Sequence, residues 1–401
     1  MNQNLIFVII GIALVSIIPL AFFGFTEEEK SSEGVIRLIE EPPDILLDEK
    51  LRNFETKNPN ADKILSQCGS DNHCAVEALW DLASNEPQPI VFDALSDITS
   101  AYSDLAYYCH GTAHHFGMFV FGMTQNMTEA LEFAKKRDCG GAMYHGAIEN
   151  YFLTEMIVND AKIDKIEFVN ICQSLGGDAK TMKRVECAHG TGHGLAKVYD
   201  YDVFASVKRC DEFPEAVERR LCYEGVFMEN TVAQREAEGG TFDEKDILFP
   251  CNKLDPKYAG ACYYYHTSYI LREKGTVDGG FQVCNSVTPE ASLKYCYMGL
   301  GRQVGGFLFD EIEKMIPVCQ KGIEDYQWLC YQGALIVIFD QRGLDEAFKA
   351  CKIFPQDFKK SCYTLLGDWI RNETPAREDR EKACSLAENS KYIDVCVNAK
   401  I

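Results

Sequence analysis

The chain has 401 residues, of which 46% are hydrophobic and 18 are cysteine, and 61 acidic against 40 basic residues give a formal net charge of −21. So much apolar surface excludes disorder as the dominant state. The acidic balance argues against nucleic acid as a partner, because such a chain repels phosphates. It favours cations and basic partners instead.

The amino-terminal segment is the only long apolar run. Leu5–Phe25 contains 21 residues without a charge, enough to cross about 30 Å of hydrocarbon as a helix. We interpret residues 1–25 as a transmembrane anchor or signal-anchor that contacts the membrane through residues 5–25. No Lys or Arg precedes the run and TEEEK follows it, which favours a body outside the cytoplasm. A cleaved signal peptide is the alternative, although no small-x-small cleavage site is present.

The following segments divide by composition. Residues 26–60 are acidic and contain EEPPD and NPN, which predicts a solvated stalk. We expect His-rich helical repeats over 61–200 and cysteine-paired helical repeats over 201–401. So many thiols without a CxxC pair indicate an oxidising compartment outside the cytoplasm.

Cysteines recur in pairs with 10 or 11 residues between the two members, and with 14 in the first pair. The second members follow one another after 35, 40, 34, 34, 32 and 34 residues, which is the period of helical-hairpin repeats. The pairs are Cys172 and Cys187, Cys210 and Cys222, Cys251 and Cys262, Cys284 and Cys296, Cys319 and Cys330, Cys351 and Cys362, and Cys384 and Cys396.

This periodicity predicts an all-α fold, a solenoid of αα-hairpins of about 34 residues with disulfides, preceded by one transmembrane helix. The first cysteine of a pair would end one helix, and the second would lie in the opening turns of the next. A bridge across each hairpin closes a loop of about 12 residues and contributes roughly 3 kcal/mol. A bridge from each second cysteine to the next repeat is equally periodic. Cys68, Cys74, Cys109 and Cys139 fall outside the series, and the spacing does not pair them.

The second cysteine opens a shared motif, with CYEG at Cys222, CYMG at Cys296 and CYQG at Cys330. This arrangement resembles the cysteine-rich Sel1-like repeat proteins, most closely over Ala347–Ile370 and more loosely over residues 165–400. The resemblance is architectural: the loop between cysteines is longer here and the G-x-G-V turn is missing. It implies disulfide-stapled helical hairpins and a protein partner on the concave face of the solenoid.

Six of the eight histidines lie within 84 positions, in CHGTAHHFG, YHGAIENYF and CAHGTGHGL. Aligned on His-Gly, the three segments occupy the position of Glu224-Gly225, Met298-Gly299 and Gln332-Gly333 in later repeats. Each segment repeats a polar side chain after four residues, which places both on one helix face. The resulting candidates are His110, His114, His145, Glu149, His189 and His193.

Imidazoles and a carboxylate from adjacent helices suit one or two divalent transition-metal ions, with zinc, iron and copper all admissible. The glycine after each histidine lets the helices approach closely. We therefore expect a metal site, whereas His115, His73 and His266 read as structural, and a column of tyrosines reads as packing between helices. Histidines that only pack between helices are the alternative, and the protein would then be an interaction or assembly scaffold.

The sequence leaves enzymatic activity undecided. A bound metal with open positions would permit hydrolase or oxygenase chemistry. The arrangement is similar by analogy to deoxyhypusine hydroxylase, whose His-Glu dipeptides are absent here. HExxH, GxSxG, a phosphate-binding GK[ST] loop and CxxCH are also absent, so no cofactor other than a metal is predicted.

Overall fold

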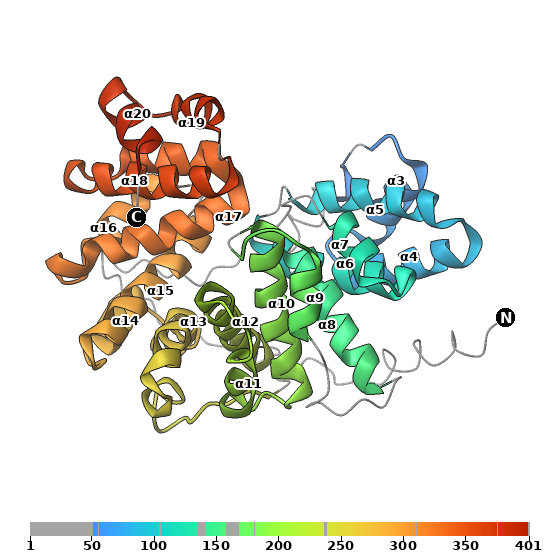
Figure 1. The fold of residues 1–401 in the computed structure, drawn as a ribbon, viewed down its shortest axis with the longest axis horizontal. Coiled ribbons are helices and arrows are strands. Elements are labelled where there is room, and N and C mark those ends of the chain that lie inside the picture. Colours follow the sequence, from blue (N-terminus) through green and yellow to red (C-terminus); the bar gives the residue numbers. More distant parts are fainter. Residues whose placement is uncertain are drawn as a thin grey trace, which may run out of the picture. The chain divides into compact units, whose positions relative to one another are not determined.

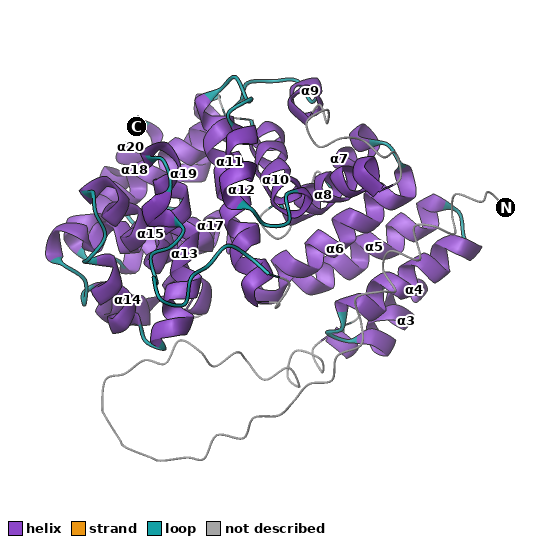
Figure 2. Cartoon of the chain, turned by 90° about the horizontal axis from the view of Figure 1, so that it is seen from below, coloured by secondary structure: helices purple, strands orange, loops and turns teal. Residues whose placement is uncertain are grey.

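The computed structural model describes residues 51–54, 56–103, 106–134, 141–157, 168–179, 181–235, 239–308, 311–374 and 376–399. Within these ranges the regular structure is helical and contains no strand (Figure 2), so the predicted all-α class is confirmed. No helix in the described part is long and apolar enough to span a membrane. The predicted anchor, residues 1–25, and the stalk up to residue 50 lie outside the described residues.

Local capping sets several helix ends. The side chain of Asn58 accepts hydrogen bonds from the backbone amides of the first turn of α3 (Pro59–Cys68), and Asp202 does the same for α11 (Val203–Cys210). Asp255 caps α13 (Pro256–Lys274), which begins with a proline and ends at Gly275 in the left-handed conformation. These polar and glycine residues therefore fix where the repeats turn.

The helices form successive pairs along the chain (Figure 1). Besides α3 and α11, the first elements of the pairs are α5 (Gln88–Ser103), α7 (Met127–Phe133), α9 (Phe168–Ser174), the short 3₁₀ turn η2 (Cys251–Lys253), α14 (Val277–Cys284), α16 (Met315–Cys319, preceded by η3, Ile312–Lys314) and α19 (Arg377–Cys384). Besides α13, the second helices are α4 (Asn72–Asn85), α6 (Ala106–Thr124), α8 (Ala142–Ile157), α10 (Met182–Val198), α12 (Ala216–Arg235), α15 (Glu290–Leu308), α17 (Gln327–Ile353, preceded by η4, Glu324–Tyr326), α18 (Gln356–Glu373) and α20 (Ser390–Val397).

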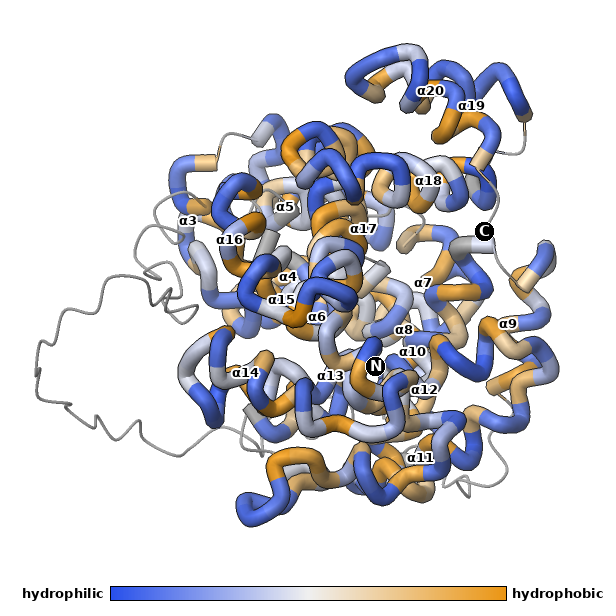
Figure 3. The backbone as a smooth tube through the Cα atoms, turned by 90° about the vertical axis from the view of Figure 1, so that its left-hand side faces the viewer, coloured by the Kyte–Doolittle hydropathy of each residue, from blue (hydrophilic) through white to orange (hydrophobic). Residues whose placement is uncertain are grey.

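From α6 onward each second helix packs against the second helix of the next pair, in the order α6, α8, α10, α12, α13, α15, α17, α18 and α20. This is the helical-repeat architecture that the cysteine spacing predicts. The long α17 serves two pairs, because Gly343 interrupts it with φ 80°, a value that favours glycine. Hydrophobic and hydrophilic segments alternate along the helices (Figure 3), as expected when each buries one face in a shared core.

Each regular cysteine pair forms a disulfide within its own pair of helices, from Cys172–Cys187 to Cys384–Cys396, so the alternative connectivity between repeats is not the one adopted. The structure also joins Cys68 to Cys74, which the spacing did not reveal. Cys139 lies outside the described residues, as does the side chain of Cys109. The described disulfides indicate an oxidising environment.

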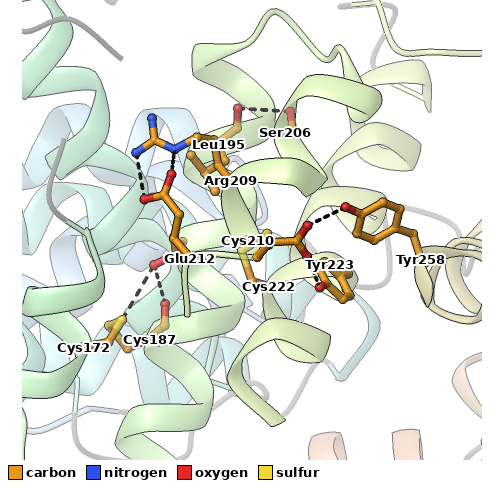
Figure 4. The surroundings of a disulfide bond; sticks show 12 residues. Cys172, Cys187, Leu195, Ser206, Arg209, Cys210, Glu212, Cys222, Tyr223 and Tyr258 are labelled. Atoms are coloured by element: carbon orange, nitrogen blue, oxygen red, sulfur yellow. Dashed lines mark hydrogen bonds and ion pairs between the residues drawn. A yellow bond between two sulfur atoms is a disulfide. The ribbon is translucent and has the colours of Figure 1, made fainter. Parts of the chain in front are cut away.

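The tyrosine after the second cysteine forms a hydrogen bond across the hairpin, next to the disulfide. Tyr297 donates a hydrogen bond to Asn285, the residue after Cys284, at 2.6 Å. Tyr223 likewise donates to Asp211, which also accepts a hydrogen bond from Tyr258 of the next pair. Figure 4 shows Tyr223 and Tyr258 beside the Cys210–Cys222 bridge. The predicted packing role of these tyrosines is confirmed.

Peptide mapping under non-reducing conditions tests this connectivity. We expect Cys330 in a peptide linked to Cys319, because the two sulfurs are bonded across the turn between α16 and α17. A peptide linking Cys330 to Cys351 would contradict the arrangement. The native protein is digested without reduction, with any free thiols blocked at once so that disulfides do not exchange. A reduced aliquot then identifies the separate peptides.

Candidate metal centre

Three consecutive second helices carry the candidate histidines. His110 and His114 lie on α6, His145 lies on α8, and His189 and His193 lie on α10. The last three are buried, with exposed fractions of 2%, 7% and 1%, and the first two are half-buried. Histidines four residues apart, such as His189 and His193, therefore lie on one face of their helix, as predicted.

Glycines allow the backbones to approach closely at this level. A Cβ added to Gly146 would lie 1.9 Å from the carbonyl oxygen of His114, and one added to Gly190 would lie 2.9 Å from the Cα of His145. Repeats without histidine share this contact, since a Cβ on Gly333 would lie 1.8 Å from the carbonyl oxygen of Met298. The glycine thus belongs to the fold, and the histidines use the closeness that it permits.

His145 is the centre of the cluster. Its ring centroid lies 5.4 Å from that of His110, 5.2 Å from His114, 4.6 Å from His189 and 5.2 Å from His193. The rings of His114 and His193 are 4.8 Å apart although their helices flank α8. Side chains of alternate helices therefore meet in front of the helix between them.

Two overlapping groups of three histidines are compact enough to hold a metal ion. They are His110, His114 and His145, and His145, His189 and His193, with candidate ligand atoms in each group within 4.8 Å of one another. Nδ1 of His145 lies 3.3 Å from Nε2 of His114. This distance is that of a hydrogen bond between the two rings, and it is also compatible with two nitrogens bound at about 2.0–2.1 Å to one tetrahedral ion.

In three of the rings, a carboxylate contacts the nitrogen that is not the candidate metal ligand. Glu186 lies 2.8 Å from Nε2 of His145, and Glu229 lies 2.7 Å from Nδ1 of His193. Glu149 lies 3.6 Å from Nδ1 of His114. Such contacts fix the tautomer and leave the other nitrogen as an acceptor, as metal-binding histidines require. Nε2 of His193 is buried, and no described residue offers it a hydrogen bond.

Lys197 joins two of these carboxylates, since its Nζ lies 2.9 Å from Glu149 and 3.4 Å from Glu229. Burial by itself raises the pKa of Glu149, but Lys197 and His114 outweigh it and bring the pKa to about 2. Burial opposes the charge of Lys197, yet the two carboxylates raise its pKa. Lys197 therefore supports two histidines through their carboxylates.

Burial favours the neutral form of the three buried histidines. Burial, and then the neighbouring rings, lower the pKa of His145, His189 and His193 well below the ordinary value of 6.5. A neutral imidazole keeps a lone pair for a metal. Burial and the neighbouring rings therefore favour the protonation state that a ligand needs.

The sequence missed Glu186, Lys197 and Glu229. Lys197 continues the four-residue step from His189 through His193, so the helical period could have revealed it. Glu149 lies beside the cluster as expected, but its oxygens contact Lys197 and His114, and its role as a direct ligand stays a prediction.

Two of the histidines that were expected to be structural contact backbone carbonyl groups. His115 lies 3.0 Å from the carbonyl oxygen of Gly111, and His266 lies 2.7 Å from that of Ile247. His73 packs edge-on against His115, with ring centroids 5.0 Å apart. None of these three histidines belongs to the two groups of three around His145.

No protein-family model, curated protein or solved structure matches the chain.

Replacing Gly146 by alanine should disrupt the cluster, because the new Cβ would collide with the backbone of α6 at His114. We expect a loss of at least about 1–3 kcal/mol of unfolding free energy, measured by urea denaturation. Gly111→Ala is the matched control, since no described atom lies within 4 Å of its added Cβ and alanine is worth about 0.5–1 kcal/mol in a helix relative to glycine. Equal effects of the two changes would contradict the close approach.

Replacing Lys197 by methionine should cost about 3 kcal/mol, because it leaves two buried carboxylates without their shared cation. Lys314→Met removes an exposed pair with Glu311 and should cost less than about 1 kcal/mol. Urea denaturation of both variants at neutral pH measures the difference. If Lys197→Met were as harmless as the control, the Lys197 contacts would carry no stability.

Proposed function

We propose that the protein binds one or two divalent transition-metal ions through His110, His114, His145, His189 and His193. The observation that carries this proposal is the convergence of four imidazoles, two from α6 and two from α10, on the fifth, that of His145 on α8. A structural role alone gives no reason for Nε2 of His193 to be buried without a hydrogen-bond partner among the described residues. A metal ion would satisfy it.

The supporting contacts fit this chemistry. Glu186, Glu229 and Glu149 contact the outer nitrogens of three rings, which is how ligating histidines are oriented in metal sites. We propose that Glu149 acts mainly by holding His114, in place of the direct coordination expected from its spacing. Lys197 offsets the charge of two carboxylates that would otherwise compete for the ion.

Imidazole nitrogen is a donor that zinc, iron and copper all accept. A group of three histidines leaves a fourth position on a tetrahedral ion, where catalytic sites hold water or substrate. The site is therefore compatible with hydrolytic or oxygen chemistry as well as with metal storage or delivery. The donor set supports metal binding itself most directly.

The surroundings that we propose are extracytoplasmic. The disulfides favour an oxidising compartment, and the apolar run at residues 5–25 would anchor the body to a membrane. Disulfides within helix pairs are also compatible with the resemblance to Sel1-like repeats. That resemblance favours a protein partner on the concave face. An interaction scaffold with structural histidines is the rival function.

Metal analysis of the purified soluble body, residues 26–401, tests the proposal. After loading with Zn²⁺, Co²⁺ or Cu²⁺ and gel filtration, we expect one or two equivalents of metal per chain and a higher melting temperature that chelator reverses. His145→Ala should abolish retention, because His145 belongs to both groups of three histidines.

His266→Ala is the matched control. His266 is as buried as His145, at 2% exposed, but contacts a backbone carbonyl on another part of the fold. It should lose stability and keep its metal. Wild-type protein that retains none of the three metals, with a melting temperature insensitive to chelator, would establish the scaffold instead.

A further inference from the structure

The helix face that carries the histidines continues beyond them. In the repeat alignment, Glu224 on α12 takes the position of His189, and Arg302 on α15 takes the position of His193, six residues after the second cysteine of its repeat. Arg302 therefore belongs to the same column of side chains as two of the proposed ligands. Its residue type differs, and so does the chemistry that it offers.

Two tyrosines connect Arg302 to the histidine cluster. The ring centroid of Tyr265 lies 6.2 Å from that of His189, in front of α12, which lies between their helices. The guanidinium carbon of Arg302 lies 4.7 Å from the centre of the same tyrosine ring and 5.9 Å from that of Tyr264. The guanidinium carbon of Arg302 therefore lies no farther from the ring centroid of His189 than the sum of these two distances, 6.2 Å and 4.7 Å.

Arg302 is placed to bind an anion. It is half-buried, and no described carboxylate forms an ion pair with it, although burial raises the pKa of the Glu224 carboxyl and the charge of Arg302 acts against that rise. Glu224, the acidic residue in the neighbouring column, pairs with Arg220 at 3.2 Å. A guanidinium stacked on an aromatic ring keeps its edge N–H groups for a carboxylate, which it binds with two parallel hydrogen bonds.

His189 faces this side of the cluster. It is 7% exposed, as are Tyr264 and Tyr265, whereas His145 and His193 are 2% and 1% exposed. Among the three buried rings, a molecule bound along the tyrosines would therefore meet His189 first, whereas His110 and His114, which are half-buried, are the more exposed rings of the cluster.

We infer that Arg302 binds the carboxylate of a small organic anion whose other end reaches the metal ion at His189, with Tyr265 between them. This inference rests on the proposed metal site. It defines the ligand class of that site as small carboxylates with a second donor group. The tyrosine rings provide the apolar contact for the carbon chain between the two ends.

Titration of the Co²⁺-loaded full-length chain with succinate and with acetate tests the inference, because the visible spectrum of Co²⁺ reports a change of ligands. Succinate has a second carboxylate for Arg302 and acetate does not. We expect succinate to bind about tenfold more tightly. Arg302→Met should remove this advantage and leave acetate binding unchanged, and Arg302→Lys should restore part of it.

Arg272→Met is the matched control, since Arg272 also lies over a tyrosine, Tyr269, at 5.7 Å, but at the end of α13. It should keep the preference for succinate. Equal binding of the two anions by the wild type, or a preference that survives in Arg302→Met, overturns the inference. Failure to load Co²⁺ at all would instead overturn the proposed function, so the two failures are distinguishable.

Discussion

The close approach of successive second helices is the constraint on which the cluster depends. Where a glycine faces a backbone carbonyl, as Gly146 faces His114, the helices come nearer than any side chain with a Cβ would allow. Side chains on one face of alternate helices then meet in front of the helix between them, as His114 and His193 do. A looser stack would leave the same residues on separate surfaces.

The same backbone serves different chemistry along the chain. Gly299 and Gly333 make the same close contacts between repeats that carry Met298 and Gln332 in place of histidine. From α10 onward the disulfides hold each hairpin at the level of these contacts, because the second cysteine lies two residues before the variable position, as Cys187 does before His189 and Cys296 before Met298. Stability and binding are thus separated: cysteine, tyrosine and glycine build the repeat, and the variable positions determine what it binds.

The sequence was informative wherever a period was visible. The spacing of the cysteines predicted the helical pairs, and the four-residue steps predicted which histidines share a face. It could not choose the disulfide connectivity, because both pairings have the same period. Nor could it find Glu186 or Glu229, whose positions matter only through the packing of neighbouring helices. Glu149 satisfied the spacing, but the nearby Lys197 gave its carboxylate a different partner.

The oxidised state of the cysteines narrows the metal chemistry further. Every cysteine whose side chain is described forms a disulfide, so thiolate is excluded as a donor from that part of the chain. The donors that remain around His145 are nitrogen and oxygen, which suit divalent zinc, iron and copper better than soft monovalent copper. Because the Cys172–Cys187 disulfide braces the pair of α9 and α10, His189 and His193 are held in place before an ion arrives. Less ordering is then needed on binding, and this advantage depends on the oxidising environment that keeps the hairpins closed.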